Sequence, residues 1–356
     1  MPPTKPRPER MQKKCTMRKL STPQLRRRFL AVAGTTAVLW GLGVQQANAQ
    51  PTLAGAEKDV EPLPQLRIGY QKSAVNLVIL KQQGVLEKRF LGTKITWAEF
   101  PAGPQLLEAL SVGSLEFGLT GDAPPVFAQA AGKDLLYVAA EPPKPYSSAI
   151  LVLGDSPIRT TVELKGKKIA LQKGSSAHYL LVRAVEKAGL TWHDIQPIYL
   201  TPADARAAFE RQSVDAWAIW DPFYAATELA IKPRVLVTGR ELSNNNSFCL
   251  SPRAFTARHP KTLAILLQEL TRADTFAQTS RRETIKLIAD FSGLDAGIVS
   301  LFIQRRPASP VGPLSAATVV DQQRVADTFF KLGLIPRSVK VAEIVWRPDG
   351  TQLARR

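Results

Sequence analysis

The sequence contains few of the residues that build metal centres and disulfides. Its 356 residues include two cysteines and three histidines, and His178, His193 and His259 show no metal-ligand spacing. Motifs of common enzyme classes are also missing, including G-x-S-x-G, H-E-x-x-H, G-x-x-x-x-G-K-S/T and a helix-opening G-x-G-x-x-G. No pair of carboxylates stands out as a general acid and base. We therefore expect no metal, no cofactor and no enzymatic activity.

Long hydrophobic runs are also missing. One uncharged and mostly apolar stretch, residues 29–44, spans 16 residues, which is short of the about 20 that a transmembrane helix needs. Ten basic residues precede it and Ala47-Asn48-Ala49 follows it, so the pattern predicts a cleavable signal peptide over residues 1–49. Arg26-Arg27-Arg28-Phe29-Leu30 also fits a twin-arginine signal. The twin-arginine and general secretory routes both stay open.

Removal of this leader changes the charge and cysteine arguments. It takes away ten basic residues and one acidic residue, which leaves 307 residues and lowers the formal net charge from +17 to +8. The high isoelectric point of the full chain is therefore no argument for a nucleic-acid partner, and a modest positive charge suits the capture of an anion. Cys15 leaves with the leader, so Cys249 has no intrachain disulfide partner.

The rest of the chain alternates between strand-like and helix-like segments. Residues 50–64 are rich in proline and predict a mobile arm. The predicted strands that follow are 66–70, 94–100, 115–119, 135–139, 148–152, 168–172, 195–200 and 214–220, with amphipathic helices between most of them. This alternation is typical of an α/β fold with a mostly parallel sheet.

The length and one proline-rich connector indicate two lobes. Glu141-Pro142-Pro143-Lys144-Pro145 interrupts the alternation, and from about Phe248 the pattern predicts mainly helix, with helices at 261–279, 281–291 and 316–332. We place the boundaries of lobe I, lobe II and the second, helix-rich part of lobe I at residues 65–147, 148–246 and 247–356.

Three predicted strand-to-helix turns carry small and polar residues. They are Tyr70-Gln71-Lys72-Ser73, Gly121-Asp122-Ala123 and Gly174-Ser175-Ser176-Ala177-His178. Ligands of open α/β sheets bind beyond the carboxyl ends of the strands, and a helix N-terminus presents free N–H groups and a favourable dipole to an anion. As a set, the turns predict a site for a small anion.

Simpler interpretations of the same residues stay open. Asp122, and Ser175 or Ser176, are preferred N-cap residues, and a capping role for Asp122 does not exclude a ligand contact. A lysine such as Lys72 is more often solvated than bound to a ligand. A histidine on a helix, such as His178, is more often an ordinary side chain than a metal ligand. Trp220, at the end of a strand beside Asp221, could form an aromatic wall of a cleft or pack in the core.

These segments resemble the aliphatic sulfonate-binding proteins of ABC-type importers. The similarity lies in Leu66-Arg67-Ile68-Gly69-Tyr70-Gln71-Lys72, Phe100-Pro101-Ala102-Gly103-Pro104-Gln105, Thr120-Gly121-Asp122, Glu141-Pro142-Pro143-Lys144-Pro145, Gln172-Lys173-Gly174-Ser175-Ser176, Leu200-Thr201-Pro202-Ala203-Asp204-Ala205-Arg206 and Trp217-Ala218-Ile219-Trp220-Asp221-Pro222. It extends from about Leu66 to Trp346-Arg347-Pro348. The turn after Lys72, Ser73-Ala74-Val75-Asn76, is bulkier than the glycine-rich form of the family.

The resemblance implies a two-lobed periplasmic binding protein (type II) with the sulfonate in the cleft between the lobes. The contacts that it implies are Gln71, Gly121, Asp122, Ser175, Ser176, His178, Trp220 and Asp221, and Lys72 and Gly174 complete the predicted set from the same turns. It further implies a periplasmic monomer that delivers its ligand to a membrane permease. Alternatives are a binding protein for taurine or nitrate, or a secreted enzyme on the same scaffold. The leader disfavours the effector domain of a regulator.

Overall fold

The computed structural model of the protein describes residues 63–347. The predicted signal peptide (1–49), its Cys15 and all but the last two residues of the predicted arm (50–64) lie outside the described residues. Within the described part of the chain, none of the helices combines the length and the hydrophobicity needed to cross a membrane.

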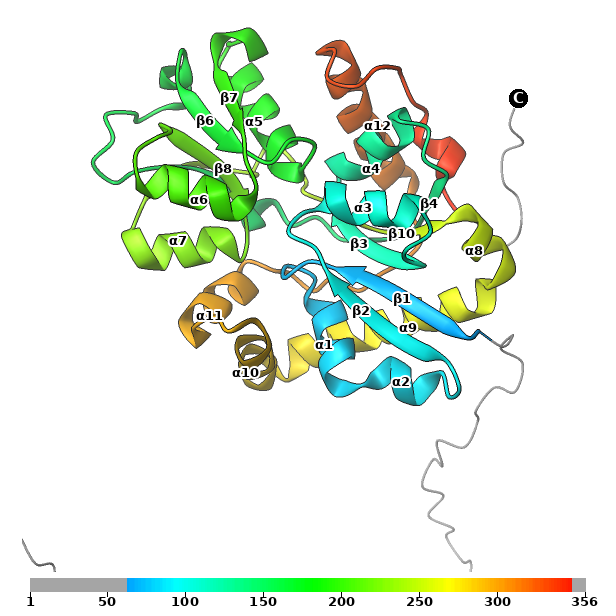
Figure 1. Ribbon diagram of the computed structural model, residues 1–356. Coiled ribbons are helices and arrows are strands. Elements are labelled where there is room, and N and C mark those ends of the chain that lie inside the picture. The colour runs from blue at the N-terminus through cyan, green and yellow to red at the C-terminus, as the bar shows by residue number, and fades with distance from the viewer. Residues whose placement is uncertain (1–62, 348–356) are drawn as a thin grey trace, which may run out of the picture. The chain divides into compact units, whose positions relative to one another are not determined.

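Two five-stranded sheets organise the described residues, and we call each sheet with its covering helices a lobe (Figure 1). The first sheet has the order β2-β1-β3-β10-β4. Its strands are β1 (Gln65–Tyr70), β2 (Lys94–Glu99), β3 (Phe117–Gly121), β4 (Leu135–Glu141) and β10 (Ser247–Pro252). The second sheet has the order β7-β6-β8-β5-β9. Its strands are β5 (Ser148–Val152), β6 (Lys168–Leu171), β7 (Gln196–Tyr199), β8 (Ala216–Trp220) and β9 (Arg234–Thr238).

The two sheets share one pattern of strand directions. In each, three strands pair in parallel, and one antiparallel strand separates them from a fifth strand that runs their way. The antiparallel strand is β10 in the first sheet and β5 in the second. Each of these two strands is the first strand that the chain forms after it crosses from the other lobe. Each runs antiparallel to both of its neighbours in the sheet.

Helices cover both faces of each sheet. They are α1 (Val75–Gln83), α2 (Val85–Arg89), α3 (Gly103–Ser111), α4 (Ala123–Ala130), α5 (Ser176–Lys187), α6 (Pro202–Glu210), α7 (Phe223–Ile231), α8 (Arg253–Arg258), α9 (Pro260–Thr279), α10 (Arg281–Ser292), α11 (Ala296–Gln304) and α12 (Ala316–Lys331), with short 3₁₀ segments at Pro145–Ser147, Thr161–Leu164, Trp192–Asp194 and Val341–Ile344. Residues of α1 and α9 pack on one face of the first sheet, and those of α3, α4 and α12 on the other. α5 and α6 cover opposite faces of the second sheet.

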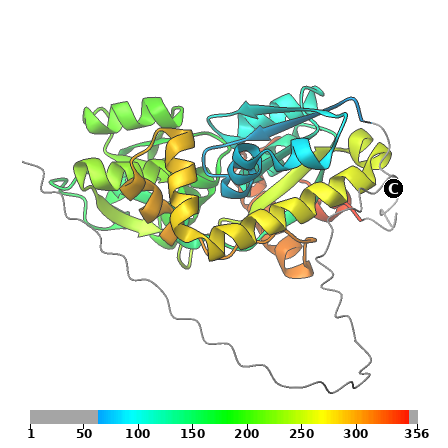
Figure 2. The ribbon, with the colours of Figure 1, turned by 90° about the horizontal axis from the view of Figure 1, so that it is seen from below.

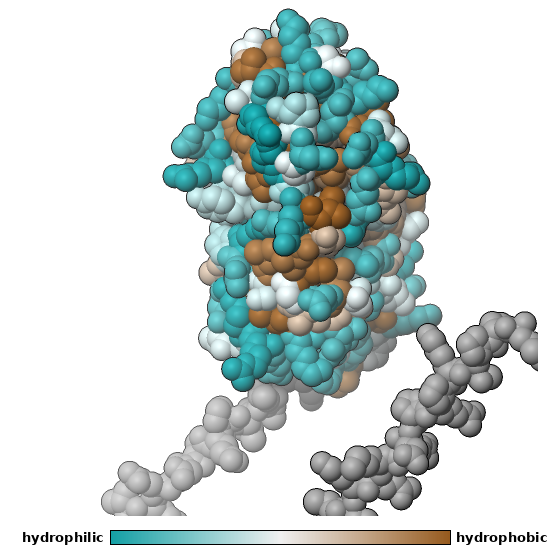
Figure 3. Space-filling model, turned by 90° about the vertical axis from the view of Figure 1, so that its left-hand side faces the viewer, coloured by the Kyte–Doolittle hydropathy of each residue, from teal (hydrophilic) through white to brown (hydrophobic). Residues whose placement is uncertain are grey.

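Local signals in the sequence set many of these helix boundaries. α1 ends at Gly84, whose positive φ of 58° favours glycine. Ser175 and Thr201 cap α5 and α6 with their hydroxyls, and Pro104 stands in the first turn of α3, where its missing N–H costs nothing. The side of the molecule that carries the second lobe together with α10 and α11 is mostly hydrophilic, with hydrophobic residues gathered in the middle of the view (Figure 3).

The predicted helix-rich region from about Phe248 is confirmed from α8 onward, but the prediction omits one strand at its start. Residues Ser247–Pro252 form β10, which inserts between β3 and β4. The apolar run Phe248-Cys249-Leu250 fits a buried strand and a buried helix equally well, because a short run shows no periodicity. Its pairing with strands more than 100 residues earlier decides the outcome. Cys249 is buried there as a free cysteine.

A third segment links the lobes besides the two crossings. α9 runs along the first lobe, and α10 and α11 continue from it toward α7 of the second lobe (Figure 2). Val299, Phe302 and Ile303 of α11 belong to the hydrophobic core beneath the first sheet. We assign α11 to the first lobe on this ground, although Ala225 of α7 belongs to the same core and α11 contacts α7.

Candidate functional site

A cavity lined by polar and apolar residues lies between the two lobes. First-lobe residues from the ends of β1 and β3, second-lobe residues from the start of α5 and the end of β8, and both crossing segments line it. The lining residues are Gln71, Ser73, Gly103, Leu119, Thr120, Gly121, Pro124, Lys144, Ser147, Ser175, Ser176, Trp220, Asp221, Asn245, Ser247, Phe302 and Arg306. Six of the ten predicted site residues are among them: Gln71, Gly121, Ser175, Ser176, Trp220 and Asp221. Lys72, Asp122, Gly174 and His178 are not.

The turn before α5 is held by its own side chains. Gly174 has a φ of 72°, a conformation that glycine adopts without strain. Ser175 accepts a hydrogen bond from the His178 backbone N–H (3.3 Å) and donates one from its hydroxyl to the carbonyl of Gln172 (2.7 Å). Ser175 therefore caps the helix and lines the cavity at once, so the capping and the ligand-binding interpretations are compatible.

His178 supports this turn from behind. It is fully buried, and its Nδ1 accepts a hydrogen bond from the Gly174 backbone N–H at 3.1 Å. Its ring lies 5.0 Å from Phe329 and 5.1 Å from Trp192 between centroids. Burial, helped by the nearby charge of Lys173, lowers the pKa of His178 to about 3. The imidazole is thus neutral and acts on the cavity through the turn that it holds.

We expect His178→Leu to destabilise the protein. The change leaves the Gly174 N–H unpaired and replaces a ring packed among aromatic side chains, so the free energy of unfolding should fall by about 2–4 kcal/mol. Thermal and urea unfolding measure this loss. His193 is exposed, and His193→Leu is the matched control with little expected change. Equal stability of the two variants would contradict the supporting role of His178.

Gly121 and Asp122 bring the first lobe into contact with the start of α5. A Cβ atom at Gly121 would lie 1.9 Å from the Ser176 Oγ, so only glycine allows the present approach. Asp122 caps α4 through a hydrogen bond from the Ala123 N–H (2.8 Å) and accepts others from Ser176 and Ser243. Burial raises the pKa of Asp122 to about 6, although these hydrogen bonds favour the ionised form. Asp122 thus ties the second-lobe turn to the first lobe from outside the cavity.

Asp221 is a buried acid at the cavity. Its Oδ1 accepts hydrogen bonds from the Ala225 N–H (3.0 Å) and from Arg305 (3.1 Å), whereas its Oδ2 has no partner within the described part of the chain. Burial raises the pKa of Asp221 to about 7, although Arg305 favours the charged form. Trp220 precedes it and packs edge-on against Phe223, with 6.2 Å between the ring centroids.

Gln71 and Lys72 differ in their placement. Gln71 is buried, and its Nε2 donates to the carbonyl of Leu119 at 3.3 Å. Lys72 instead lies 4.0 Å from Glu99, and both side chains are more than a third exposed. Lys72 is therefore solvated, as the simpler interpretation of this residue predicts.

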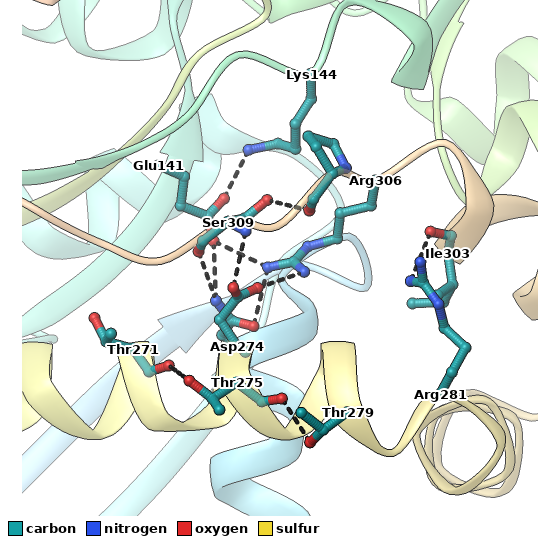
Figure 4. A network of polar contacts seen from close by, with 12 residues as sticks. Glu141, Lys144, Thr271, Asp274, Thr275, Thr279, Arg281, Ile303, Arg306 and Ser309 are labelled. Atoms are coloured by element: carbon teal, nitrogen blue, oxygen red, sulfur yellow. Dashed lines mark hydrogen bonds and ion pairs between the residues drawn. The ribbon is translucent and has the colours of Figure 1, made fainter.

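Two cations that no sequence pattern marks as site residues also line the cavity, Lys144 and Arg306. Lys144 pairs with Glu141 at 2.7 Å. Arg306 donates to Asp274 at 2.8 Å and to Asn76 at 3.0 Å, and lies 3.7 Å from Glu141 (Figure 4). Lys144 stands in the proline-rich connector, which is typical of a linker and not of a site, and Arg306 belongs to no motif.

The polar groups of the cavity are mainly hydrogen-bond donors. Among residues 63–347, the hydroxyls of Thr120 and Ser147 are buried without a partner, and Lys144 and Arg306 have N–H groups beyond those in their bonds to Glu141, Asp274 and Asn76. Such a set suits an anion that accepts several hydrogen bonds. Among residues 63–347, no cluster of histidine, cysteine or acidic side chains has the makings of a metal site.

Two α/β lobes joined by crossing segments around a cavity define a two-lobed binding protein. The chain belongs to the NMT1-like family, whose model matches residues 59–292. Within this family it groups with the aliphatic sulfonate-binding proteins. The relatives that establish this grouping are binding proteins and are similar over most of their length.

Two solved structures and one curated relative are similar over most of this chain. The alkanesulfonate-binding protein SsuA from Xanthomonas axonopodis pv. citri, solved bound to MOPS, is 50% identical, with coverage of 81% of this chain and 99% of that chain and a TM-score of 0.78. The periplasmic aliphatic sulphonate binding protein SsuA from Escherichia coli is 47% identical, with coverage of 83% and 95% and a TM-score of 0.75. A relative from Escherichia coli (strain K12), provisionally named an aliphatic sulfonates-binding protein, is 48% identical over 81% of this chain and 91% of its own length. These similarities confirm the predicted fold class and family.

Proposed function

We propose that the protein captures aliphatic sulfonates in the periplasm as the solute-binding component of an ABC importer. The observation that carries the proposal is the donor-rich cavity between the lobes, with unpartnered hydroxyls on Thr120 and Ser147. A sulfonate is ionised at any physiological pH and presents three acceptor oxygens, so these donors can be satisfied without a proton transfer. The names of relatives at 47–50% identity support the same ligand class over taurine and nitrate.

We propose a division of roles among the predicted site residues. Gln71, Gly121, Ser175 and Ser176 hold the sulfonate head, and Trp220 contacts the aliphatic tail beside Asp221. Asp122, Gly174 and His178 position these groups, and Lys72 contributes positive charge near the entrance. The moving bodies are the lobes with the predicted boundaries 65–147 with 247–356, and 148–246. Closure of the lobes excludes water and presents one surface to a membrane permease.

The proposal includes export by the cleavable leader of residues 1–49, a monomeric state, and binding without turnover. Mass spectrometry of the ligand after incubation with the protein tests the last point. An unchanged ligand supports a binding protein, and a released product would establish the alternative of a secreted enzyme.

We expect the tryptophan fluorescence of the protein to change when an alkanesulfonate is added and to stay constant with inorganic sulfate. The reason is that Trp220 lines the cavity, where an aliphatic tail would cover its ring. The same titration of Trp220→Phe, in which the signal should be lost, assigns the change to this residue. An equal response of the wild type to sulfate would contradict recognition of the tail.

A further inference from the structure

Arg305 joins the two lobes at the edge of the cavity. It follows α11 of the first lobe, and its guanidinium donates to Asp221 (3.1 Å) and to Glu228 of the second lobe. The guanidinium also lies 3.7 Å from the centre of the Tyr224 ring. Only 13% of the Arg305 side chain is exposed. Charge-assisted hydrogen bonds to two carboxylates and an aromatic face fix this guanidinium from three sides.

The next residue points to the opposite lobe. Arg306 binds Asp274 of α9 and Asn76 of α1, and lies near Glu141 at the end of β4. All three partners belong to the first lobe, and Figure 4 shows Arg306 beside Asp274 and Glu141. Arg306 therefore fixes the segment after α11 to the first lobe, while the adjacent Arg305 contacts the second lobe.

The contacts of Arg305 bear directly on the candidate site. Asp221 and Phe302 line the cavity on either side of the contact. Arg305 and the Ala225 N–H both occupy Oδ1 of Asp221, which leaves Oδ2 without a partner among the described residues. A change at Arg305 thus alters the orientation of a cavity residue and removes a tie between the lobes.

We propose that Arg305 is a positioning residue that fastens the second lobe over a bound ligand, and that its contacts with Asp221 and Glu228 slow ligand release. This inference rests on the proposed function, because it requires a ligand held between the lobes. The proposal requires that opening of the lobes breaks these contacts. They then stabilise the closed, bound state and leave the encounter step unchanged. Their loss therefore appears in the dissociation rate.

The test measures association and dissociation rates of an alkanesulfonate by stopped-flow tryptophan fluorescence. We expect Glu228→Gln and Arg305→Gln each to raise the dissociation rate by about tenfold, with association rates close to the wild type. Arg305→Lys should recover part of the loss, since it retains the charge without the two-pronged geometry. In the double variant, the dissociation rate should rise by less than the product of the two single increases, because both substitutions break the same contact between Arg305 and Glu228.

Lys286→Gln is the control, because it removes an exposed lysine from an ion pair with Asp290 on α10, outside the cavity lining. It should leave both rates unchanged. Thermal unfolding without ligand shows which variants are folded, and Glu228→Gln, at a partly exposed position, keeps the test valid if Arg305→Gln does not fold. Wild-type dissociation rates in folded variants would overturn the role of Arg305 alone. Failure of the wild-type protein to bind any alkanesulfonate would overturn the proposed function instead.

Discussion

Gly121→Ala should weaken alkanesulfonate binding by at least about tenfold while the protein stays folded. The added methyl group would lie 1.9 Å from the Ser176 Oγ, so the hydroxyl must rotate and lose its hydrogen bond to Asp122. The first-lobe turn and the start of α5 then cannot approach as closely, and the donors no longer surround one anion. A loss of about 1.4 kcal/mol in binding free energy corresponds to this factor. Isothermal titration calorimetry measures it.

Two further variants identify the cause. A methyl group added at Gly312 would meet no atom within 4 Å, and the φ of this residue is not positive. Gly312→Ala is therefore a matched control with wild-type affinity expected. Ser176→Gly removes the side chain that the new methyl group meets. If the collision is responsible, Gly121→Ala should cost much less affinity in the Ser176→Gly background than in the wild type. An equal cost in both backgrounds would contradict a steric contact between these two residues.

Binding of a simple alkanesulfonate should weaken by about tenfold between pH 6 and pH 8. Burial raises the pKa of Asp221 to about 7, so this carboxyl at the cavity loses its proton within the interval. The ligand remains an anion throughout, and we expect its repulsion by the ionised Asp221 to outweigh the stronger contact of this carboxylate with Arg305. Below pH 7 the neutral carboxyl can donate a hydrogen bond to a sulfonate oxygen. Affinity measured across this range, at constant ionic strength, tests the direction.

The residues that face Asp221 determine the size of this effect. Arg305 favours the ionised form, whereas burial and the nearby Glu228 favour the neutral form. Asp221→Asn keeps a donor at every pH and should remove most of the pH dependence. Asp122 has a pKa of about 6 and acts on the cavity only through Ser176. Asp122→Asn should therefore leave in place the part of the dependence that is centred near pH 7. An affinity that rises from pH 6 to pH 8 would contradict the assignment to Asp221.

The sequence is most informative where the determining interactions are local. Asp122, Ser175 and Thr201 cap their helices by accepting hydrogen bonds from backbone N–H groups one to three residues later. Gly84 ends its helix by its own backbone conformation. Such signals act within one turn of chain, so they predict where strands give way to helices. They thereby bring Gly121, Ser175 and Ser176 to the carboxyl ends of strands, where the structure has the cavity.

The remaining features depend on pairings across the chain. Arg306 hydrogen-bonds Asn76 across 230 residues, and no local pattern distinguishes it from a solvated arginine. The edge strand β9 is absent from the predicted strands, because only its pairing with β5 places it in the second sheet. His178 carries a signal for polarity but none for its burial among rings from distant segments. Long-range packing decides these outcomes, and one sequence does not display it.

The position of β10 in the first sheet determines which of the two lobes can be completed first during synthesis. All five strands of the second sheet lie within Ser148–Val152 through Arg234–Thr238, one continuous stretch. The first sheet instead needs Ser247–Pro252 to fill the position between β3 and β4. During synthesis the later lobe can therefore finish first, and the earlier one keeps two open strand edges until the chain returns. An unfilled sheet position invites pairing with other chains, so the first lobe is the part that is exposed to aggregation before synthesis has passed Pro252.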